Sequence, residues 1–235
     1  MLQNFYQVFR EGGFDQVMRL ERLEADGKLS TRYFQNVVPI DMSKIVVNET
    51  FRDLQGRWDV DPDGRVYIAE THADYVIRVC NPDGSIDRVI ERAYTHRKRS
   101  REEFQYVLDV QRTLNRFPRI HFDIDENDRD IIAIWARPDG GCWVLTSRGC
   151  YDRRPGTLGV FDAFDSEGRL VREVTLVGTG DPVQDFYAFI GERVYVVTDM
   201  LDGILALHGD AEGTAKNETA EPMSVIRYST RGSEH

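Results

Sequence analysis

Short apolar runs separated by glycine turns recur along the chain and predict a series of antiparallel hairpins. One type of hairpin turns at residues 62–64, at 138–140 and at Gly191. Each of these turns follows a short apolar run and leads into a strand rich in aromatic and β-branched residues, such as residues 66–69. The glycine supplies the positive φ angle that a short hairpin loop needs. The pattern therefore predicts three hairpins of one type.

A second type of hairpin, with more polar strands, alternates with the first. Its turns lie at residues 81–84, at 165–168 and, near the start of the chain, at 24–27. Apolar and polar residues alternate in the strands on either side, which is typical of strands with one exposed face. Two hairpins in series form a four-stranded antiparallel meander, which is the unit of a propeller blade.

Counting these units predicts an all-β fold, a β-propeller of four-stranded antiparallel blades, with about three and a half blades present in a single domain. One blade is expected at 57–91, one at 130–177 and one at 185–230. In the third blade, the last strand follows a loop that is widened by the polar, acidic stretch 208–222. At the N-terminus only an outer hairpin, 17–34, is expected. Its inner hairpin is absent or degenerate in residues 1–13, and residues 35–56 are interpreted as a connecting segment.

One helical insertion is expected between the first two complete blades, at residues 100–117. Ser100 and Glu103 have the spacing of a capping box, in which each side chain satisfies the other residue's free backbone amide. Apolar residues then follow at helical spacing from Phe104 to Leu114, and Pro118 comes soon afterwards. We expect a helix at 101–115.

Two neighbouring segments of the first complete blade carry a resemblance to a known repeat. Residues 60–70 and 76–84 resemble the NHL repeat, except that Glu70 stands where the family usually has Asp and Cys80 stands near its Phe. Over residues 14–230 the chain is similar to the C-terminal portion of bacterial six-bladed β-propeller proteins of largely unassigned function. The resemblance implies a propeller fold and leaves the activity open, because propellers host binding, scaffolding and catalysis alike.

Six blades of this size would need far more than 235 residues. We therefore expect a truncated portion of a longer propeller, and the alternative is a homodimer in which two copies close the ring. The family that the chain resembles is often exported. Residues 1–6 lack the basic and apolar regions of a signal peptide, so the compartment stays open.

Charge and cysteine content narrow the function classes. The chain has 30 Lys and Arg against 40 Asp and Glu, a formal charge of −10, which argues against nucleic acid as the partner. No apolar window is long enough for a spanning helix, so an integral membrane protein is not expected.

Cys80, Cys142 and Cys150 form no CxxC pair and are expected as buried thiols. Five aromatic residues at strand positions are expected in the core: Trp58, Tyr67, Trp135, Trp143 and Tyr195.

The candidate site is the rim of the propeller, where the loop after the second strand of each blade opens. Three such loops carry carboxylates, a histidine, an arginine and a tyrosine. The candidate ligand-binding residues are Glu70, His72, Asp74, Arg148, Tyr151, Asp199 and Asp202. Such a convergence suits a polar small molecule, a protein ligand or a divalent metal such as calcium.

Two functions fit this rim. The first is a binding or interaction module for a small ligand or a protein. The second is a metal-dependent propeller enzyme, a lactonase-like hydrolase or lyase, with Glu70, His72, Asp199 and Asp202 as the metal ligands. One histidine with scattered acids is a weak ligand set, so the binding module is favoured and no catalytic residue is assigned.

Two further charged segments have plainer interpretations. Asp123, Asp125 and Asn127 have the offsets of a calcium loop, but Asp128 replaces the turn glycine and Ile134 replaces the bidentate glutamate. Residues 121–130 are therefore interpreted as an acidic connector. The basic run 97–99, with Arg101, directly precedes the predicted helix and is interpreted as a solvated run.

Overall fold

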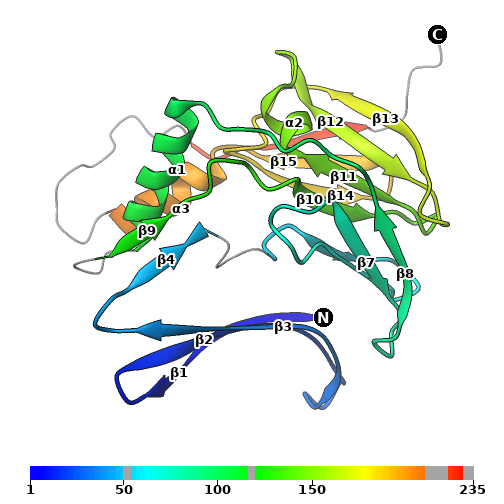
Figure 1. Cartoon of the computed structure of the whole chain (residues 1–235). Helices are drawn as coiled ribbons and strands as arrows, with labels where there is room; N and C mark the ends of the chain where they lie inside the picture. The colour runs from blue at the N-terminus through cyan, green and yellow to red at the C-terminus, as the bar shows by residue number, and fades with distance from the viewer. Residues whose placement is uncertain (50–53, 116–119, 210–221, 230–235) are drawn as a thin grey trace, which may run out of the picture.

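The computed structural model describes residues 1–49, 54–115, 120–209 and 222–229 (Figure 1). Most of its elements are strands in small antiparallel sheets, and none of the sheets among these residues closes on itself. This confirms the all-β class. None of the described helices is long and apolar enough to cross a membrane.

Two of the sheets are four-stranded meanders at the positions that the glycine turns predict. The second sheet of the chain contains β5 (Trp58–Val60), β6 (Val66–Ile68), β7 (Val76–Cys80) and β8 (Ile86–Glu91). The third sheet contains β10 (Ile131–Ala136), β11 (Cys142–Thr146), β12 (Thr157–Phe164) and β13 (Leu170–Val177). The turn glycines Gly64 and Gly84 have φ angles of 83° and 88°, which side chains disfavour.

The first sheet is larger than the sequence pattern indicates. It contains β1 (Leu2–Arg10), β2 (Gly13–Leu23) and β3 (Leu29–Asp41), paired in that order. Residues 1–13 are therefore not a degenerate hairpin, because β1 pairs with β2 along its whole length. Residues 35–56 are only partly a connection, since β3 runs seven residues past position 34 and β4 (Val46–Asn48) follows it. Residues 50–53 lie outside the described residues.

The fourth sheet contains β14 (Phe186–Ile190), β15 (Arg193–Val197) and β16 (Val225–Ser229). Helix α3 (Met200–Gly209) follows β15, at a position where the pattern predicted only a loop. The acidic stretch 208–222 begins inside α3, and residues 210–221 lie outside the described part of the chain.

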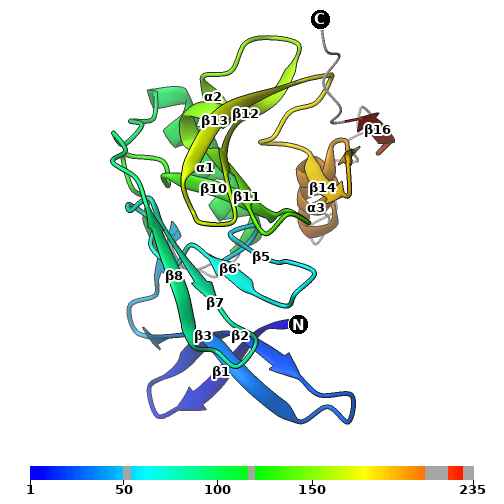
Figure 2. The ribbon, with the colours of Figure 1, turned by 90° about the vertical axis from the view of Figure 1, so that its right-hand side faces the viewer.

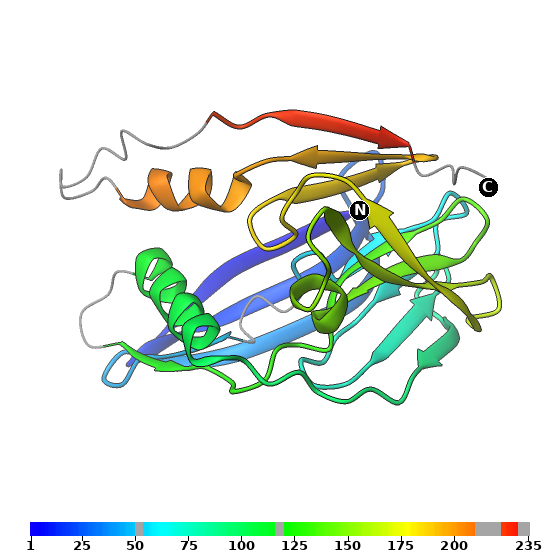
Figure 3. The same cartoon turned by 90° about the horizontal axis from the view of Figure 1, so that it is seen from above.

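The other helices and one parallel strand pair connect these sheets. Helix α1 (Arg101–Leu114) begins with the predicted capping box, in which the Glu103 amide donates to Ser100 Oγ at 3.2 Å. The short helix α2 (Ser147–Tyr151) lies between β11 and β12. Strand β9 (His121–Asp123) pairs in parallel with β4, which brings residues 46–48 beside residues 121–123. Helices α1 and α3 contact each other and lie on one side of the sheets (Figures 1 and 3).

Figure 2 shows the four antiparallel sheets following one another in chain order, and three apolar clusters join them. The first cluster lies between the first and second sheets, the second between the second and third, and the third between the third and fourth. Each sheet therefore packs on the next through its apolar side chains. The fully buried members of the three clusters include Leu20, Ile68, Ile77, Ile134, Val144, Phe161 and Val196.

The predicted core residues agree with these clusters with one exception. Tyr67 is buried, while Trp58, Trp135 and Trp143 pack against the clusters. Tyr195 is the exception, because the register of β15 places it opposite Ala188 and Arg227, on the face away from buried Val194 and Val196. The three cysteines are buried free thiols, as predicted.

Candidate functional site

The first predicted rim loop, after β6, is held by polar contacts. Glu70 is half-buried and forms an ion pair with Arg78; burial raises the pKa of the Glu70 carboxyl, against the opposing charge of Arg78. His72 is buried, and its carbonyl oxygen accepts a hydrogen bond from the Asp130 amide at 3.1 Å. Asp74 is exposed, and its carbonyl oxygen accepts from Thr71 Oγ1.

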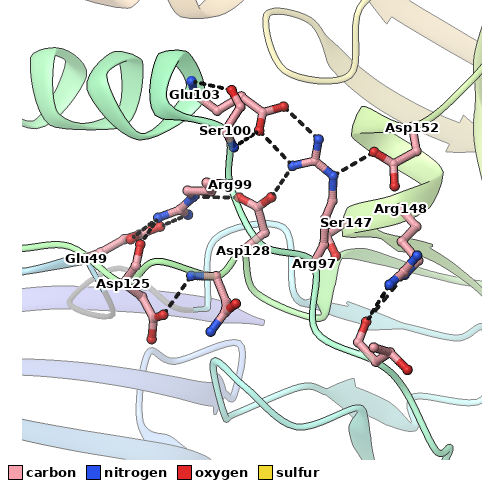
Figure 4. Close-up of polar contacts among 12 residues, drawn as sticks. Glu49, Arg97, Arg99, Ser100, Glu103, Asp125, Asp128, Ser147, Arg148 and Asp152 are labelled. Carbon is pink, nitrogen blue, oxygen red and sulfur yellow. Dashed lines mark hydrogen bonds and ion pairs between the residues drawn. The ribbon is translucent and has the colours of Figure 1, made fainter.

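The second predicted loop is the short helix α2. Thr146 caps it, because its Oγ1 accepts from the Gly149 amide at 3.0 Å. The Ser147 amide donates to the Asp130 carbonyl oxygen at 3.2 Å, so the first two loops meet at Asp130. Arg148 is exposed and its guanidinium donates to the Thr95 carbonyl oxygen (Figure 4).

The third predicted loop lies at the start of α3. Asp199 has a φ angle of 56°, and its amide donates to Asp185 Oδ1 at 2.9 Å. Asp202 is exposed in the first helical turn. Among the described residues, no three His, Cys, Asp or Glu side chains come together as metal ligands would. The set Glu70, His72, Asp199 and Asp202 is therefore not assembled, and its role as a ligand set stays a prediction.

The basic run before α1 forms the centre of a buried ion network instead. Arg97 donates through Nε to Asp152 at 2.8 Å, through Nη1 to Asp128 at 2.7 Å and through Nη2 to Glu103 at 2.7 Å (Figure 4). Its guanidinium also lies 4.6 Å from the centre of the Tyr151 ring. Burial lowers the pKa of Arg97, but the hydrogen bonds to Glu103 and the two aspartates outweigh it and raise the pKa.

Arg99 extends the same network. Its side chain is 4% exposed, and its Nε donates to Asp128 Oδ1 at 2.7 Å. Its Nη1 donates to Glu49 Oε2 at 2.7 Å and to the Asp125 carbonyl oxygen at 2.9 Å. The interpretation of 97–99 as a solvated run is therefore wrong for Arg97 and Arg99, because both meet buried carboxylates from distant parts of the chain. It is right for Lys98, whose partner Glu126 is equally exposed.

This network also corrects the interpretation of residues 121–130 as a simple acidic connector. Asp128 and Asp130 are buried, at 3% and 1% exposure, while Asp123 and Asp125 are exposed. Asp128 holds both arginines, one on each carboxylate oxygen. Asp125 Oδ1 accepts from the Asn127 amide and so stabilises a local turn.

A cavity of about 320 Å³ lies beside the network, and we call it the α1 cavity. It is formed by one face of α1, the start of β10, the end of α2, residues 182–183 and Leu201 of α3. It brings Tyr151, a predicted rim residue, close to Leu201, the neighbour of Asp202. Its polar lining residues are Glu49, Gln55, Arg99, Tyr106, Gln111, Asp128, Arg129 and Tyr151.

The titratable groups of the α1 cavity favour binding over covalent chemistry. Burial raises the pKa of Cys150 to about 12, so this thiol is protonated and a poor nucleophile near neutral pH. Burial also raises the pKa of Tyr151 and of Tyr106, so both phenols stay neutral hydrogen-bonding groups. Tyr106 Oη already accepts from Gln184 Nε2 at 2.7 Å.

Arg129 is the cation of the cavity that the network leaves unused. It is half-buried, and it forms no hydrogen bond or ion pair with any residue that the structure describes. Arg99, in contrast, is neutralised by Glu49 and Asp128. The cavity therefore offers one available positive charge beside apolar side chains, which suits a small anion with an apolar part.

The sequence pattern predicts three rim loops, and it indicates neither the ion network nor the α1 cavity. One signal is present in the sequence. Arg97 and Arg99 are two positions apart, as are Asp128 and Asp130, and in an extended segment residues at this spacing point to the same side. The pattern within each segment does not show that these two faces meet.

The comparisons with known proteins add little to this geometry. No protein-family model matches the chain, and no curated protein matches it. One solved structure with a partial likeness is a protein of unknown function from Bacteroides caccae. It has 9% sequence identity and a TM-score of 0.31, over 83% of this chain and 71% of that one.

Proposed function

We propose that the chain is an NHL-like β-propeller portion that acts as a binding module, and that the α1 cavity takes a small anionic ligand. The four successive sheets support the propeller part of this proposal. Each packs face to face on the next through an apolar cluster, and two of them are four-stranded meanders. Stacked meanders of this kind are how propeller blades are arranged.

Arg129 carries the proposal for the ligand. An arginine without a carboxylate partner in a partly enclosed cavity binds carboxylate or phosphate oxygens through charge-assisted hydrogen bonds. The uncharged lining residues, such as Tyr106 and Gln111, would supply further hydrogen bonds, and Val107 and Val183 would contact an apolar part of the ligand. The ion network beside the cavity holds its walls in place before binding, which reduces the entropy cost of association.

The test is a thermal-shift screen of the chain against small carboxylates and organic phosphates. A ligand at about one hundred times its Kd should stabilise the fold by about 2.7 kcal/mol, because it binds only the folded state. Arg129→Gln should remove that stabilisation. Arg101→Gln is the matched control, because Arg101 is exposed at the start of α1 and does not line the cavity.

Two results would count against the proposal. A ligand that stabilises the wild type and Arg129→Gln equally binds somewhere else. Stabilisation by calcium or zinc, lost in His72→Ala or Asp199→Ala, would favour the metal-dependent enzyme instead.

A further inference from the structure

The two edges of the first sheet differ in chemistry. The β3 edge carries Arg32, Pro39 and Asp41, and its pairing with β2 is interrupted by two register shifts. The β1 edge pairs with β2 in an unbroken register, contains no proline and has Arg10 as its one charged residue. Charges, prolines and bulges are the devices that keep an edge strand from adding a further strand. The β1 edge largely lacks them.

Apolar side chains are exposed along β1. Leu2 is 40% exposed, Val8 is 48% exposed and Phe9 is 77% exposed. Beside Phe9, a groove of about 530 Å³ opens between the first sheet, β4 and α1. Exposed apolar residues gathered on one edge strand mark an interaction surface more often than isolated ones do.

The other sheet edges are covered, charged or short. The inner strands β5 and β10 contact each other, and the Tyr187 carbonyl oxygen of β14 accepts a hydrogen bond from the Trp135 indole. The outer edge strands β8 and β13 carry charges at Asp87, Arg88, Glu91, Arg172 and Glu173. β16 carries a single arginine, as β1 does, but it is only five residues long, against nine in β1.

We propose that β1 pairs antiparallel with β1 of a second copy of this chain, which joins the two first sheets into one continuous sheet. A two-fold axis through Tyr6 would then place Phe9 opposite Gln3, Val8 opposite Asn4 and Arg10 opposite Leu2. No like charges face each other in this register. An isologous contact of this kind closes after two copies and produces no filament.

Charge does not oppose a second copy at this edge. The chain has a formal charge of −10, so two copies repel each other at long range. β1 contains no acidic residue, and its one arginine, Arg10, forms an ion pair with Asp15 of β2, so the edge adds little to the repulsion. The contact differs from ring closure, because it uses a strand edge and leaves the open sheet faces uncovered.

Light scattering after size exclusion, over a series of concentrations, tests the contact. The wild type should dimerise, and Val8→Lys should raise the dissociation constant at least about tenfold, because the substitution enters the interface twice. Val37→Lys is the matched control, since Val37 is 44% exposed on the opposite edge of the sheet. This variant should dimerise like the wild type. A thermal melt of each variant checks that it folds.

A cross-linking experiment tests the register. Tyr6→Cys should form a disulfide-linked dimer under mild oxidation, because the two-fold axis brings both copies of position 6 together. Val37→Cys should not, and the native cysteines are buried and stay silent. A monomer at every concentration would overturn the proposal, as would a dimer that withstands Val8→Lys and dissociates in Ile190→Lys.

Discussion

At the scale of single residues, Asp128 is the side chain on which the ion network depends. Its two carboxylate oxygens hold Arg97 and Arg99, and all three side chains are largely buried. A buried charge pair adds little net stability relative to an apolar pair, but removing one partner leaves the other charge uncompensated.

Asp128→Ala should therefore lower the free energy of unfolding by about 3–5 kcal/mol, because it leaves two buried guanidinium groups short of a partner. Urea unfolding followed by circular dichroism measures the effect. Glu126→Ala is the control: its ion pair with Lys98 is exposed on both sides, and its loss should cost at most about 1 kcal/mol. Equal losses in both variants would contradict the role of Asp128.

Residue-scale features divide into those that local sequence determines and those that it does not. The capping box of Ser100 and Glu103 was predicted, because both partners lie within four residues of each other. The contact of Arg99 with Glu49 spans 50 residues, and nothing near either position indicates the other. Most of the candidate site is of this second kind.

At the scale of elements, the segment 92–99 is a strap that leads from β8 to α1. Tyr94 Oη and Ser147 Oγ are 3.0 Å apart, and His96 Nδ1 lies 2.9 Å from Asp130 Oδ1. With the two arginines, these contacts hold the strap against α2 and residues 125–130.

The strap makes stability depend on pH. The hydrogen bond to Asp130 and its charge raise the pKa of His96, and the charges of Asp74 and Asp125 add to this. In the unfolded chain the pKa of a histidine side chain is about 6.5. The stabilisation is therefore complete below about pH 6.5 and is lost as pH rises through the higher folded pKa.

The melting temperature of the wild type should accordingly fall relative to that of His96→Gln as pH rises through this range. His121→Gln is the control, since His121 is exposed in β9. A difference between wild type and His96→Gln that stays constant with pH would contradict the prediction.

Elements were predicted where turns and spacing are distinct. The glycine turns located the second and third sheets, and helical spacing located α1. β1 was missed, because residues 2–10 mix glutamine and asparagine with apolar residues and show no clear alternation. Five residues with a glycine are too few for a periodic signal, so the sequence pattern indicates a loop where helix α2 forms.

At the scale of the whole molecule, the contacts between neighbouring sheets bury the three apolar clusters. Phe161 of β12 is fully buried, and its ring centre lies 5.6 Å from that of Trp135 and 5.8 Å from that of Phe189. It thus joins the third sheet to the fourth.

Phe161→Ala should cost about 3–5 kcal/mol of unfolding free energy and loosen the fourth sheet selectively. Hydrogen exchange should accelerate at the amides of β14 and β15 more than at those of β6 and β7. Phe186→Ala is the control, because Phe186 is 55% exposed on the outer face of the fourth sheet. Uniform acceleration in all sheets would show that the molecule opens as one unit.

The parallel pairing of β4 with β9 has a consequence for chain connectivity. It joins residues 46–48 to residues 121–123 without a covalent bond, and the buried contact of Glu49 with Arg99 reinforces that link. Together they enclose the second sheet and α1 in a closed loop of chain. A backbone cleavage at the exposed turn 83–85 would therefore leave two polypeptides that remain associated, since the ladder and the apolar clusters still join them.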